Sequence, residues 1–249
     1  MRTISTLALK GGTAKTTVTT NVGHALAMRG QRVLLIDCCM QGNTSSLVES
    51  SDGPTLTDVL CERASLQSAI RHARHNLDIV PSDRSLDSAA KHIVAGNHKS
   101  YYILKRQIAA LKDYDLVFYD HSPSYSAVTE AVLLASDEML IPVELSPYAV
   151  DGMISMFQKL EDMLAEHTLA LTGIVPVKLD KRIAMHDAYL REIIGTFGEK
   201  VYPAIRTDNA VPKAQSFHQT VMEHSPHTRS ADDFRAVSEK VVAREEVLV

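Results

Sequence analysis

The sequence predicts an α/β fold: a doubly wound, mostly parallel sheet with helices on both faces. Short apolar runs rich in β-branched residues alternate along the chain with stretches of helical length. Several of these runs are apolar throughout, as strands are when helices cover both faces of a parallel sheet. A glycine-containing loop directly follows the first run, where a strand would turn into a helix.

The expected elements alternate in a regular order. The expected strands are residues 3–9, 32–36, 77–80, 116–119, 138–143, 169–177 and 200–205. The expected helices are residues 16–29, 100–112, 125–135, 152–167 and 184–197. No linker rich in Pro, Gly or Ser and no repeat of about 20–50 residues divides the sequence, so we expect one domain spanning residues 1–249.

The composition excludes several classes of protein. With 249 residues, 45% hydrophobic and 22% charged, the chain is globular rather than disordered or collagen-like. Its formal net charge of −4 means that any contact with DNA must come from a local basic patch. Cys38, Cys39 and Cys61 are too few for a disulfide scaffold, which favours a reducing compartment. We find no signal-peptide pattern and no apolar run near ~20 residues, so we expect a cytoplasmic protein without membrane insertion.

The loop after the first expected strand has the features of a phosphate-binding turn. Gly11 and Gly12 let the backbone approach an anion closely, and the helix that follows offers unpaired N–H groups. Lys15 would neutralise the β- and γ-phosphates, and the Thr16 hydroxyl would ligate Mg²⁺. The alternative is an ordinary strand-to-helix turn with an adjacent lysine.

Three segments resemble motifs of the ParA/MinD family of P-loop ATPases. Lys10-Gly11-Gly12-Thr13-Ala14-Lys15-Thr16-Thr17 resembles the family's deviant Walker A loop, Lys-Gly-Gly-x-Gly-Lys-[Thr/Ser], in which Lys10 would be the signature lysine. Residues 33–43 resemble the segment L-L-x-D-x-D-P-Q-G-N, and residues 114–124 resemble the Walker B and switch segment Y-D-x-x-x-x-D-x-P-P-S. Ala14 replaces a family glycine, which would cost on the order of 1 kcal/mol if that position requires a positive φ.

The resemblance implies ATP and Mg²⁺ as cofactors. Asp37 and Asp120 each end a buried apolar run, where ligands of open α/β sheets collect, and with Thr16 they are the expected metal-linked residues. The alternative is that both aspartates only cap a strand end or the following helix. Val211 and Pro212, in a segment similar to the one that commonly helps hold adenine, are expected at the base. The expected nucleotide-binding residues are Lys10, Gly11, Gly12, Thr13, Ala14, Lys15, Thr16, Thr17, Val211 and Pro212.

Cys39 departs from the family pattern at the position of the second Asp, the one usually tied to hydrolysis. A carboxylate can orient an attacking water through a charge-assisted hydrogen bond, whereas a neutral thiol is a poor acceptor. We therefore expect an ATPase with slow turnover. The expected catalytic residues are Lys10, Lys15, Asp37 and Cys39. Cys39 is interpreted as a natural variant, an engineered block or a redox-sensitive thiol.

The length and the lack of an N-terminal DNA-binding extension look most like short, Soj-type ParA proteins. That resemblance implies a homodimer in the ATP state, binding to non-specific DNA, a ParB-like or other adaptor that stimulates hydrolysis, and a nucleoid-associated location in the cytoplasm. The expected function is to segregate or position DNA or other cargo. The expected DNA contacts are Arg182, Arg206, Lys213 and Arg235, and the alternative there is a mixed solvated face.

Two other functions remain open from the sequence. A MinD-like ATPase that cycles on a membrane surface would end in a basic amphipathic helix with bulky apolar anchors. Residues 234–249 carry acids and small apolar residues instead, so we expect this tail to dock on the protein's own core. A metabolic P-loop enzyme acting on a small substrate is the third possibility, and it would need a substrate pocket that these motifs do not predict.

Overall fold

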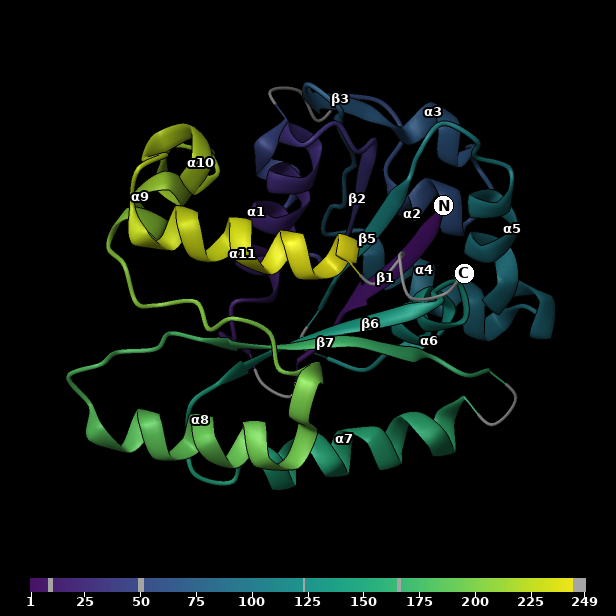
Figure 1. Ribbon diagram of the computed structural model, residues 1–249. Coiled ribbons are helices and arrows are strands. Elements are labelled where there is room, and N and C mark those ends of the chain that lie inside the picture. The colour runs from purple at the N-terminus through teal and green to yellow at the C-terminus, as the bar shows by residue number, and fades with distance from the viewer. Residues whose placement is uncertain (9–10, 49–51, 123, 165–166, 244–249) are drawn as a thin grey trace.

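A parallel sheet forms the centre of the molecule (Figure 1). The computed structural model describes residues 1–8, 11–48, 52–122, 124–164 and 167–243. Among these residues, seven strands pair in the order β3-β4-β2-β5-β1-β6-β7. All neighbours are parallel except β3 and β4, which are antiparallel. The strands are β1 Arg2–Thr6, β2 Val33–Cys38, β3 Arg71–Arg74, β4 Leu77–Val80, β5 Leu116–His121, β6 Glu138–Glu144 and β7 Ala170–Val177.

Helices cover both faces of the sheet, as the sequence predicts. The longer helices are α1 Lys15–Met28, α4 Leu86–Ala95, α6 Ala127–Leu134, α7 Ala149–Met163, α8 Ala184–Phe197 and α11 Arg229–Ala243. The shorter ones are α2 Leu56–Leu60, α3 Leu66–Ala69, α5 Ile103–Ala109, α9 Ala210–Ser216 and α10 Val221–His224, and three 3₁₀ turns occupy Ser45–Leu47, His98–Tyr102 and Gly198–Lys200. Figure 1 shows α1 and α11 on one side of the sheet and α7 and α8 along the other.

Alternating side chains build a separate core on each face. On β2, Val33 and Leu35 pack with residues of α1, whereas Leu34 and Ile36 pack with residues of α2, α4 and α6. A further apolar cluster joins β6 and β7 to α7 and α8. Because both faces are buried, β2 and β5 are apolar up to their last residues and show no in-and-out alternation, whereas the equally central β1 buries Thr3, Ser5 and Thr6.

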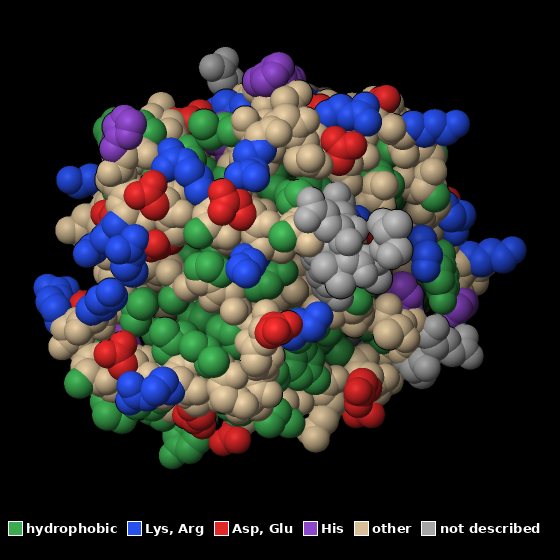
Figure 2. Space-filling model, viewed as in Figure 1, with side chains coloured by type: hydrophobic (Ala, Val, Ile, Leu, Met, Phe, Trp, Pro, Cys, Tyr) green, Lys and Arg blue, Asp and Glu red, His purple; other side chains and the backbone are tan. Residues whose placement is uncertain are grey.

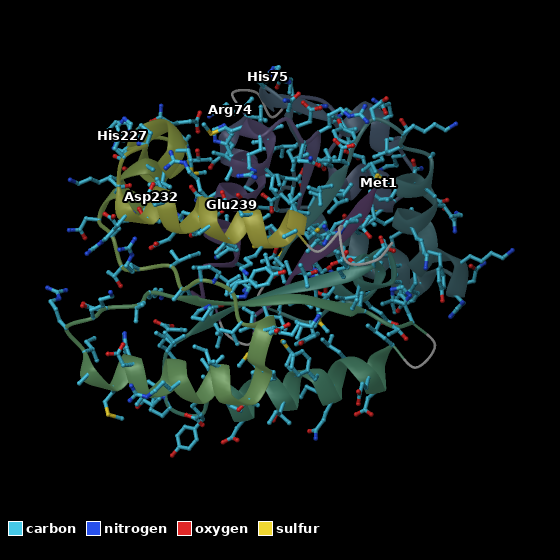
Figure 3. The ribbon with its side chains drawn as sticks, in the orientation of Figure 1. Met1, Arg74, His75, His227, Asp232 and Glu239 are labelled. Atoms are coloured by element: carbon cyan, nitrogen blue, oxygen red, sulfur yellow. The ribbon has the colours of Figure 1, made fainter. Side chains whose placement is uncertain are left out.

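The C-terminal helix packs on the first helix. Phe234, Val237 and Val241 of α11 are buried in the core that contains α1. Glu239, labelled in Figure 3, accepts a hydrogen bond from Arg29, the residue that follows α1, at 2.9 Å. For residues 234–243, this confirms the expectation that the tail docks on the protein's own core, and residues 244–249 of that tail lie outside the described residues. Among the described helices, none is both long and apolar enough to cross a bilayer.

Three expectations about secondary structure need correction. Residues 200–205 are not a strand: only isolated bridges occur at Val201 and Arg206, because Pro203 removes a backbone donor from the run. Residues 100–112 divide into a 3₁₀ turn and the shorter α5. The sequence prediction also omitted β3, whose residues Arg-His-Ala-Arg are polar because it is an edge strand.

Candidate nucleotide site

The loop between β1 and α1 turns through two left-handed residues. Gly12 has φ +78°, and Ala14 has φ 60° and ψ 26° at the N-cap of α1. The requirement for a positive φ at Ala14, raised from the sequence, is therefore confirmed, and its methyl group makes this turn strained by about 1 kcal/mol. Lys10, the expected signature lysine, lies outside the described residues.

A cavity of about 560 Å³ opens in front of this loop, at the carboxyl ends of the central strands. Its volume is in the range of small-molecule sites. The lining combines residues from the loop and α1, from the segment after β2, from the end of β5, and from α9 and the residues that follow it. These are Gly11, Gly12, Ala14, Lys15, Thr16, Thr17 and Thr20, then Cys39, Gln41, Asn43, Ser46 and Leu47, then His121, and then Gln215, His218 and Gln219.

Lys15 is the first residue of α1, and its side chain is buried. The residue is only 7% exposed, and burial lowers the pKa of its ammonium group while Asp120 and Cys39 oppose that shift. The first turn of α1 adds N–H groups that no helical carbonyl can satisfy. A lysine held beside a helix N-terminus is suited to bind a polyphosphate.

Asp120, near the end of β5, has one carboxylate oxygen in two hydrogen bonds, and among the described residues the other is buried without a partner. Its Oδ2 accepts hydrogen bonds from Thr16 Oγ1 and Thr44 Oγ1, both at 2.7 Å. Within the described residues, its buried Oδ1 has no hydrogen-bond partner. Burial raises the pKa of Asp120 to about 7, and the neighbouring Asp37 adds to the shift. Thr16 lines the cavity, and the Asp120 carboxylate bonded to it has one unpaired oxygen. Oxygen ligands of this kind are those that Mg²⁺ prefers, so these residues fit the metal.

Asp37, at the end of β2, lies opposite Asp120 in the β2–β5 pairing. Its Oδ1 accepts from the Cys39 backbone N–H at 3.0 Å. Its Oδ2 accepts from Ser45 N–H at 2.8 Å and from Ser45 Oγ at 2.7 Å. Burial raises its pKa, and the Ser45 and Cys39 hydrogen bonds counteract the shift. The structure therefore places Asp37 as the organiser of the loop that carries Cys39, while its predicted link to the metal stays a prediction.

Cys39 lines the same cavity as Lys15 and is 6% exposed. Burial raises the pKa of its thiol, and Asp37 and Asp120 raise it further. The side chain is therefore a neutral thiol at neutral pH, which is the basis for expecting slow hydrolysis. A raised pKa also disfavours the redox-sensitive interpretation, since the thiolate is the reactive form.

His121 is a buried cavity residue that the sequence prediction missed, although it directly follows Asp120. Ser136 Oγ donates its proton to the Val132 carbonyl, so Ser5 Oγ must donate to Ser136 Oγ. His121 Nε2 is then the donor to Ser5 Oγ, at 2.8 Å, which leaves Nδ1 as an acceptor. Burial lowers the pKa of His121 to about 3, with a contribution from Lys15, so the ring is neutral.

The expected adenine contacts lie beside the phosphate loop. Val211 and Pro212 line a neighbouring cavity of about 380 Å³ that shares Gly12, Ala14, Thr17 and Gln215 with the first. Gln215 Nε2 donates to Thr17 Oγ1 at 2.8 Å, which ties α9 to α1. Sequence reasoning missed the roles of Gln215, Thr44 and Ser45, because each acts through a contact with a residue far along the chain or across a loop.

Of the expected DNA-binding residues, Arg206 lines the cavity that contains Val211 and Pro212, whereas Arg182, Lys213 and Arg235 line neither cavity. Lys213 is exposed on α9, and the three arginines are paired with acids. Figure 2 shows Lys and Arg side chains along the left margin of the view, near α9, the start of α11 and the loop before α8, with Asp and Glu side chains among them. The ion pairs are Arg182–Asp180 at 2.6 Å, Arg206–Asp233 at 2.7 Å and Arg235–Asp232 at 2.8 Å.

Comparison with known proteins finds a matching family and relatives that align over nearly the full chain. A family described as an AAA domain matches residues 1–171. The chromosome-partitioning ATPase Soj of Treponema pallidum is 30% identical over 241 residues, covering 95% of each chain. The sporulation initiation inhibitor protein Soj of Bacillus subtilis is 31% identical over 243 residues, covering 94% of this chain and 95% of the relative.

The fold is shared with enzymes of other functions. The structure of cobyrinic acid a,c-diamide synthase from Mycobacterium smegmatis with bound ADP and magnesium superposes with a TM-score of 0.82 at 23% identity, covering 99% of this chain and 96% of that one. At that identity the likeness shows the fold alone, whereas the Soj relatives match the sequence over nearly its full length. The chain belongs to the ParA/MinD family of P-loop ATPases, and within that family to the Soj type.

Proposed function

We propose that this chain is a partition ATPase of the ParA/Soj type. In its ATP state it forms a homodimer, binds non-specific DNA and, with a ParB-like or other adaptor that stimulates hydrolysis, segregates or positions DNA or other cargo on the nucleoid. The observation that carries the proposal is the buried Oδ1 of Asp120, which has no partner among the described residues, in a carboxylate bonded to Thr16 at the strained turn where Lys15 begins α1. These groups are suited to Mg-ATP.

Each residue has a separate task in this proposal. Backbone N–H groups of the turn and the Lys15 ammonium bind the phosphates, and Thr16 and Asp120 hold the metal. Bound Mg²⁺ supplies positive charge that stabilises the phosphoryl group during transfer. Asp37 fixes the loop that places Cys39 against the cavity. Because the Cys39 thiol is neutral, it cannot accept a charge-assisted hydrogen bond from the attacking water.

The alternatives have weaker support. A MinD-like membrane cycle needs a free amphipathic tail, but α11 through Ala243 buries its apolar side chains against α1. A metabolic enzyme shares the fold, as the diamide synthase does, but the full-length similarity is to Soj proteins. We therefore retain the partition ATPase and test it through its dimer and its DNA binding.

Replacing Lys10 by Ala should prevent the ATP-dependent dimer while leaving mononucleotide binding largely intact. Lys10 precedes Lys15 by five residues across a glycine turn, which places it poorly for its own phosphates, and the family resemblance puts it against the partner's. Light scattering with ATP, GTP and no nucleotide measures the effect, and ATP alone should double the mass of the unmodified protein. An ATP-dependent mass that is the same with and without Lys10→Ala would refute the role across the dimer.

Replacing Arg182 by Glu should weaken DNA binding in the ATP state about tenfold or more at low salt, with a shallower salt dependence. Each phosphate contact contributes a log–log salt slope of about −0.9, and a dimer carries the contact twice. Fluorescence anisotropy with two unrelated duplexes, over a range of salt, measures both quantities. Arg63→Glu is the matched control, because Arg63 is also exposed and paired with an Asp, Asp58. Equal binding by the Arg182 variant and the control would place the DNA surface elsewhere.

A further inference from the structure

The segment that follows β2 is hydrogen-bonded within itself. The Gly42 N–H donates to the Cys39 carbonyl at 3.0 Å, and the Ser46 N–H donates to the Gly42 carbonyl at 3.1 Å. The Leu47 N–H donates to the Thr44 carbonyl at 3.2 Å. Because these bonds overlap along the chain, the position of Thr44 and the position of Cys39 depend on each other.

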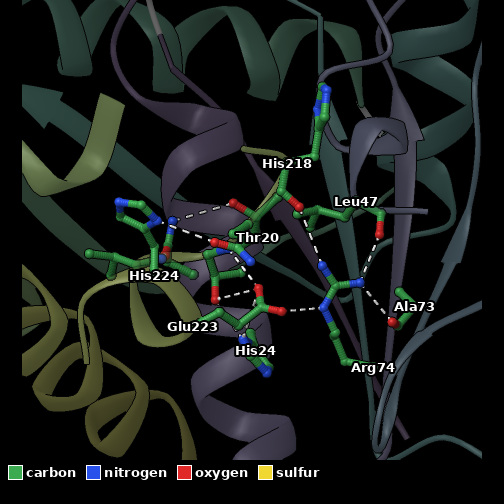
Figure 4. Close-up of polar contacts among 12 residues, drawn as sticks. Thr20, His24, Leu47, Ala73, Arg74, His218, Glu223 and His224 are labelled. Atoms are coloured by element: carbon green, nitrogen blue, oxygen red, sulfur yellow. Dashed lines mark hydrogen bonds and ion pairs between the residues drawn. The ribbon is translucent and has the colours of Figure 1, made fainter. Parts of the chain in front are cut away.

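Two other parts of the fold hold this segment in place. The Leu47 carbonyl accepts a hydrogen bond at 2.9 Å from Nη1 of Arg74, on the edge strand β3 (Figure 4). The Arg74 Nε pairs in turn with the Glu223 carboxylate. Just after β4, the Ser82 N–H donates to Ser45 Oγ at 2.9 Å. The segment is therefore fixed to β3 and to the chain that leaves β4.

Thr44 connects the segment to Asp120, and the next residue connects it to Asp37. Thr44 Oγ1 donates to Asp120 Oδ2 at 2.7 Å. Ser45 donates to Asp37 Oδ2 with its N–H at 2.8 Å and with its Oγ at 2.7 Å. Burial raises the pKa of Asp37, and the backbone N–H of Thr44 is one of the groups that counteract the shift. Thr44 is fully buried, and it is not among the described residues that line either cavity.

Two threonine hydroxyls share one oxygen of Asp120, and they can do different work there. Thr16 and Thr44 both donate to Oδ2, each at 2.7 Å. A hydroxyl has one proton and two lone pairs, so Thr16, which lines the cavity, can keep this bond and still offer its oxygen to Mg²⁺. The Thr44 hydroxyl is buried away from the cavity, so it acts on the carboxylate alone. Two donors on one oxygen restrict the rotation of the carboxylate and leave Oδ1 without a partner among the described residues.

We propose that Thr44 is a positioning residue for the metal end of the site. It fixes the orientation of the Asp120 carboxylate, and through the bonded segment it sets the place of Cys39 relative to that carboxylate. Since the hydroxyl of Thr44 cannot reach the nucleotide, its effect on nucleotide affinity passes through Asp120 and depends on Mg²⁺. The inference rests on the proposed binding of Mg-ATP, and it adds a residue outside the three segments that resemble family motifs.

The test compares ATP binding with and without the metal. Titration calorimetry measures the Kd of ATP in excess Mg²⁺ and in EDTA for the unmodified chain, Thr44→Val and Thr44→Ser. We expect Thr44→Val, which keeps the shape but not the hydroxyl, to weaken binding about tenfold in Mg²⁺ and less than about twofold in EDTA. Thr44→Ser keeps the hydroxyl and should bind within about twofold of the unmodified chain in both conditions. Thr44→Ala gives the same comparison if Thr44→Val does not fold.

A matched control is Thr19→Val, because Thr19 is fully buried on α1 and its hydroxyl has no hydrogen-bond partner among the described residues. That variant should leave both Kd values unchanged. Equal losses in Mg²⁺ and in EDTA for Thr44→Val would show that Thr44 only supports the fold of the segment. That result, no loss at all, or an equal loss in Thr44→Ser would overturn the role of Thr44 and leave the ATPase proposal standing. An unmodified chain that binds ATP no more tightly in Mg²⁺ than in EDTA would instead refute the proposed metal site.

Discussion

Replacing Cys39 by Asp is expected to raise ATP turnover about 10²–10³-fold at nearly constant nucleotide affinity. In the proposed site Lys15, Thr16 and Asp120 bind Mg-ATP, whereas the thiol at Cys39 is neutral because burial raises its pKa. A charge-assisted hydrogen bond that acts mainly in the transition state contributes roughly 2–4 kcal/mol. Phosphate release at saturating ATP measures the rate, and the lifetime of the ATP dimer should shorten accordingly.

The control for this change is Cys39→Ser, which alters the atom but adds no charge and should change the rate only a few-fold. The rival explanation is that another group already orients the water, such as a partner's side chain or a water held by Asp37. Asp37 is poorly suited, because both its oxygens accept hydrogen bonds from the loop that follows it. If Cys39→Asp is no faster than the unmodified chain, with and without DNA, Cys39 has no part in the mechanism.

Replacing Asp120 by Asn should abolish magnesium-dependent hydrolysis and stabilise the nucleotide-free protein at pH 8. In the Cys39→Asp background we expect turnover to fall at least about 100-fold, because the unpaired carboxylate oxygen is lost. The stability gain arises because a buried carboxylate is replaced by a neutral amide whose oxygen can still accept from Thr16 and Thr44. We expect about 2 kcal/mol, or about 4–8 °C in Tm.

The pH dependence of that gain follows from the pKa of Asp120, which is raised from 3.8 to about 7. An acid with a raised pKa in the folded state contributes most stability when protonated, below its unfolded pKa, and loses that contribution as pH rises to about 7. The difference in Tm between Asp120→Asn and the unmodified protein should therefore be small at pH 5 and larger at pH 8, without Mg²⁺.

Asp37→Asn provides the contrast, because Asp37 receives three hydrogen bonds on two oxygens and an amide would turn its NH₂ toward a donor. That variant should be less stable than the unmodified protein. A lower Tm for Asp120→Asn at pH 8, or the same gain in Tm at both pH values, would contradict the explanation that the buried charge of Asp120 destabilises the folded protein.

The parts of the site that sequence reasoning recovered are local in the chain. The spacing of Gly12, Ala14 and Lys15 predicts a turn into a helix, and the structure contains that turn, with the strained φ at Ala14. Asp37 and Asp120 could be placed because each ends an apolar run and parallel strands end at one edge.

The parts that sequence reasoning missed depend on distant contacts. Thr44 reaches Asp120 across 76 positions, and Gln215 reaches Thr17 across 198, so no local pattern identifies Thr44 or Gln215. The prediction of a strand at residues 200–205 was wrong for a related reason. Its apolar composition reflects packing beside the sheet, and Pro203 interrupts the backbone donors that a strand would need.

The bonds between α1 and the segment after α9 also affect when the protein can function during its synthesis. Gln215 to Thr17, Val221 to Asn21 and Thr220 to His24 join residues 196 to 200 positions apart. Contacts between residues so far apart in sequence form late in folding, because a long loop must close first. A ribosome adds about 5–20 residues to the chain each second. Synthesis therefore takes about 10–40 seconds to pass from the phosphate loop to the residues of α9 and α10 that bond to α1, and until then the nascent chain lacks that wall of the cavity.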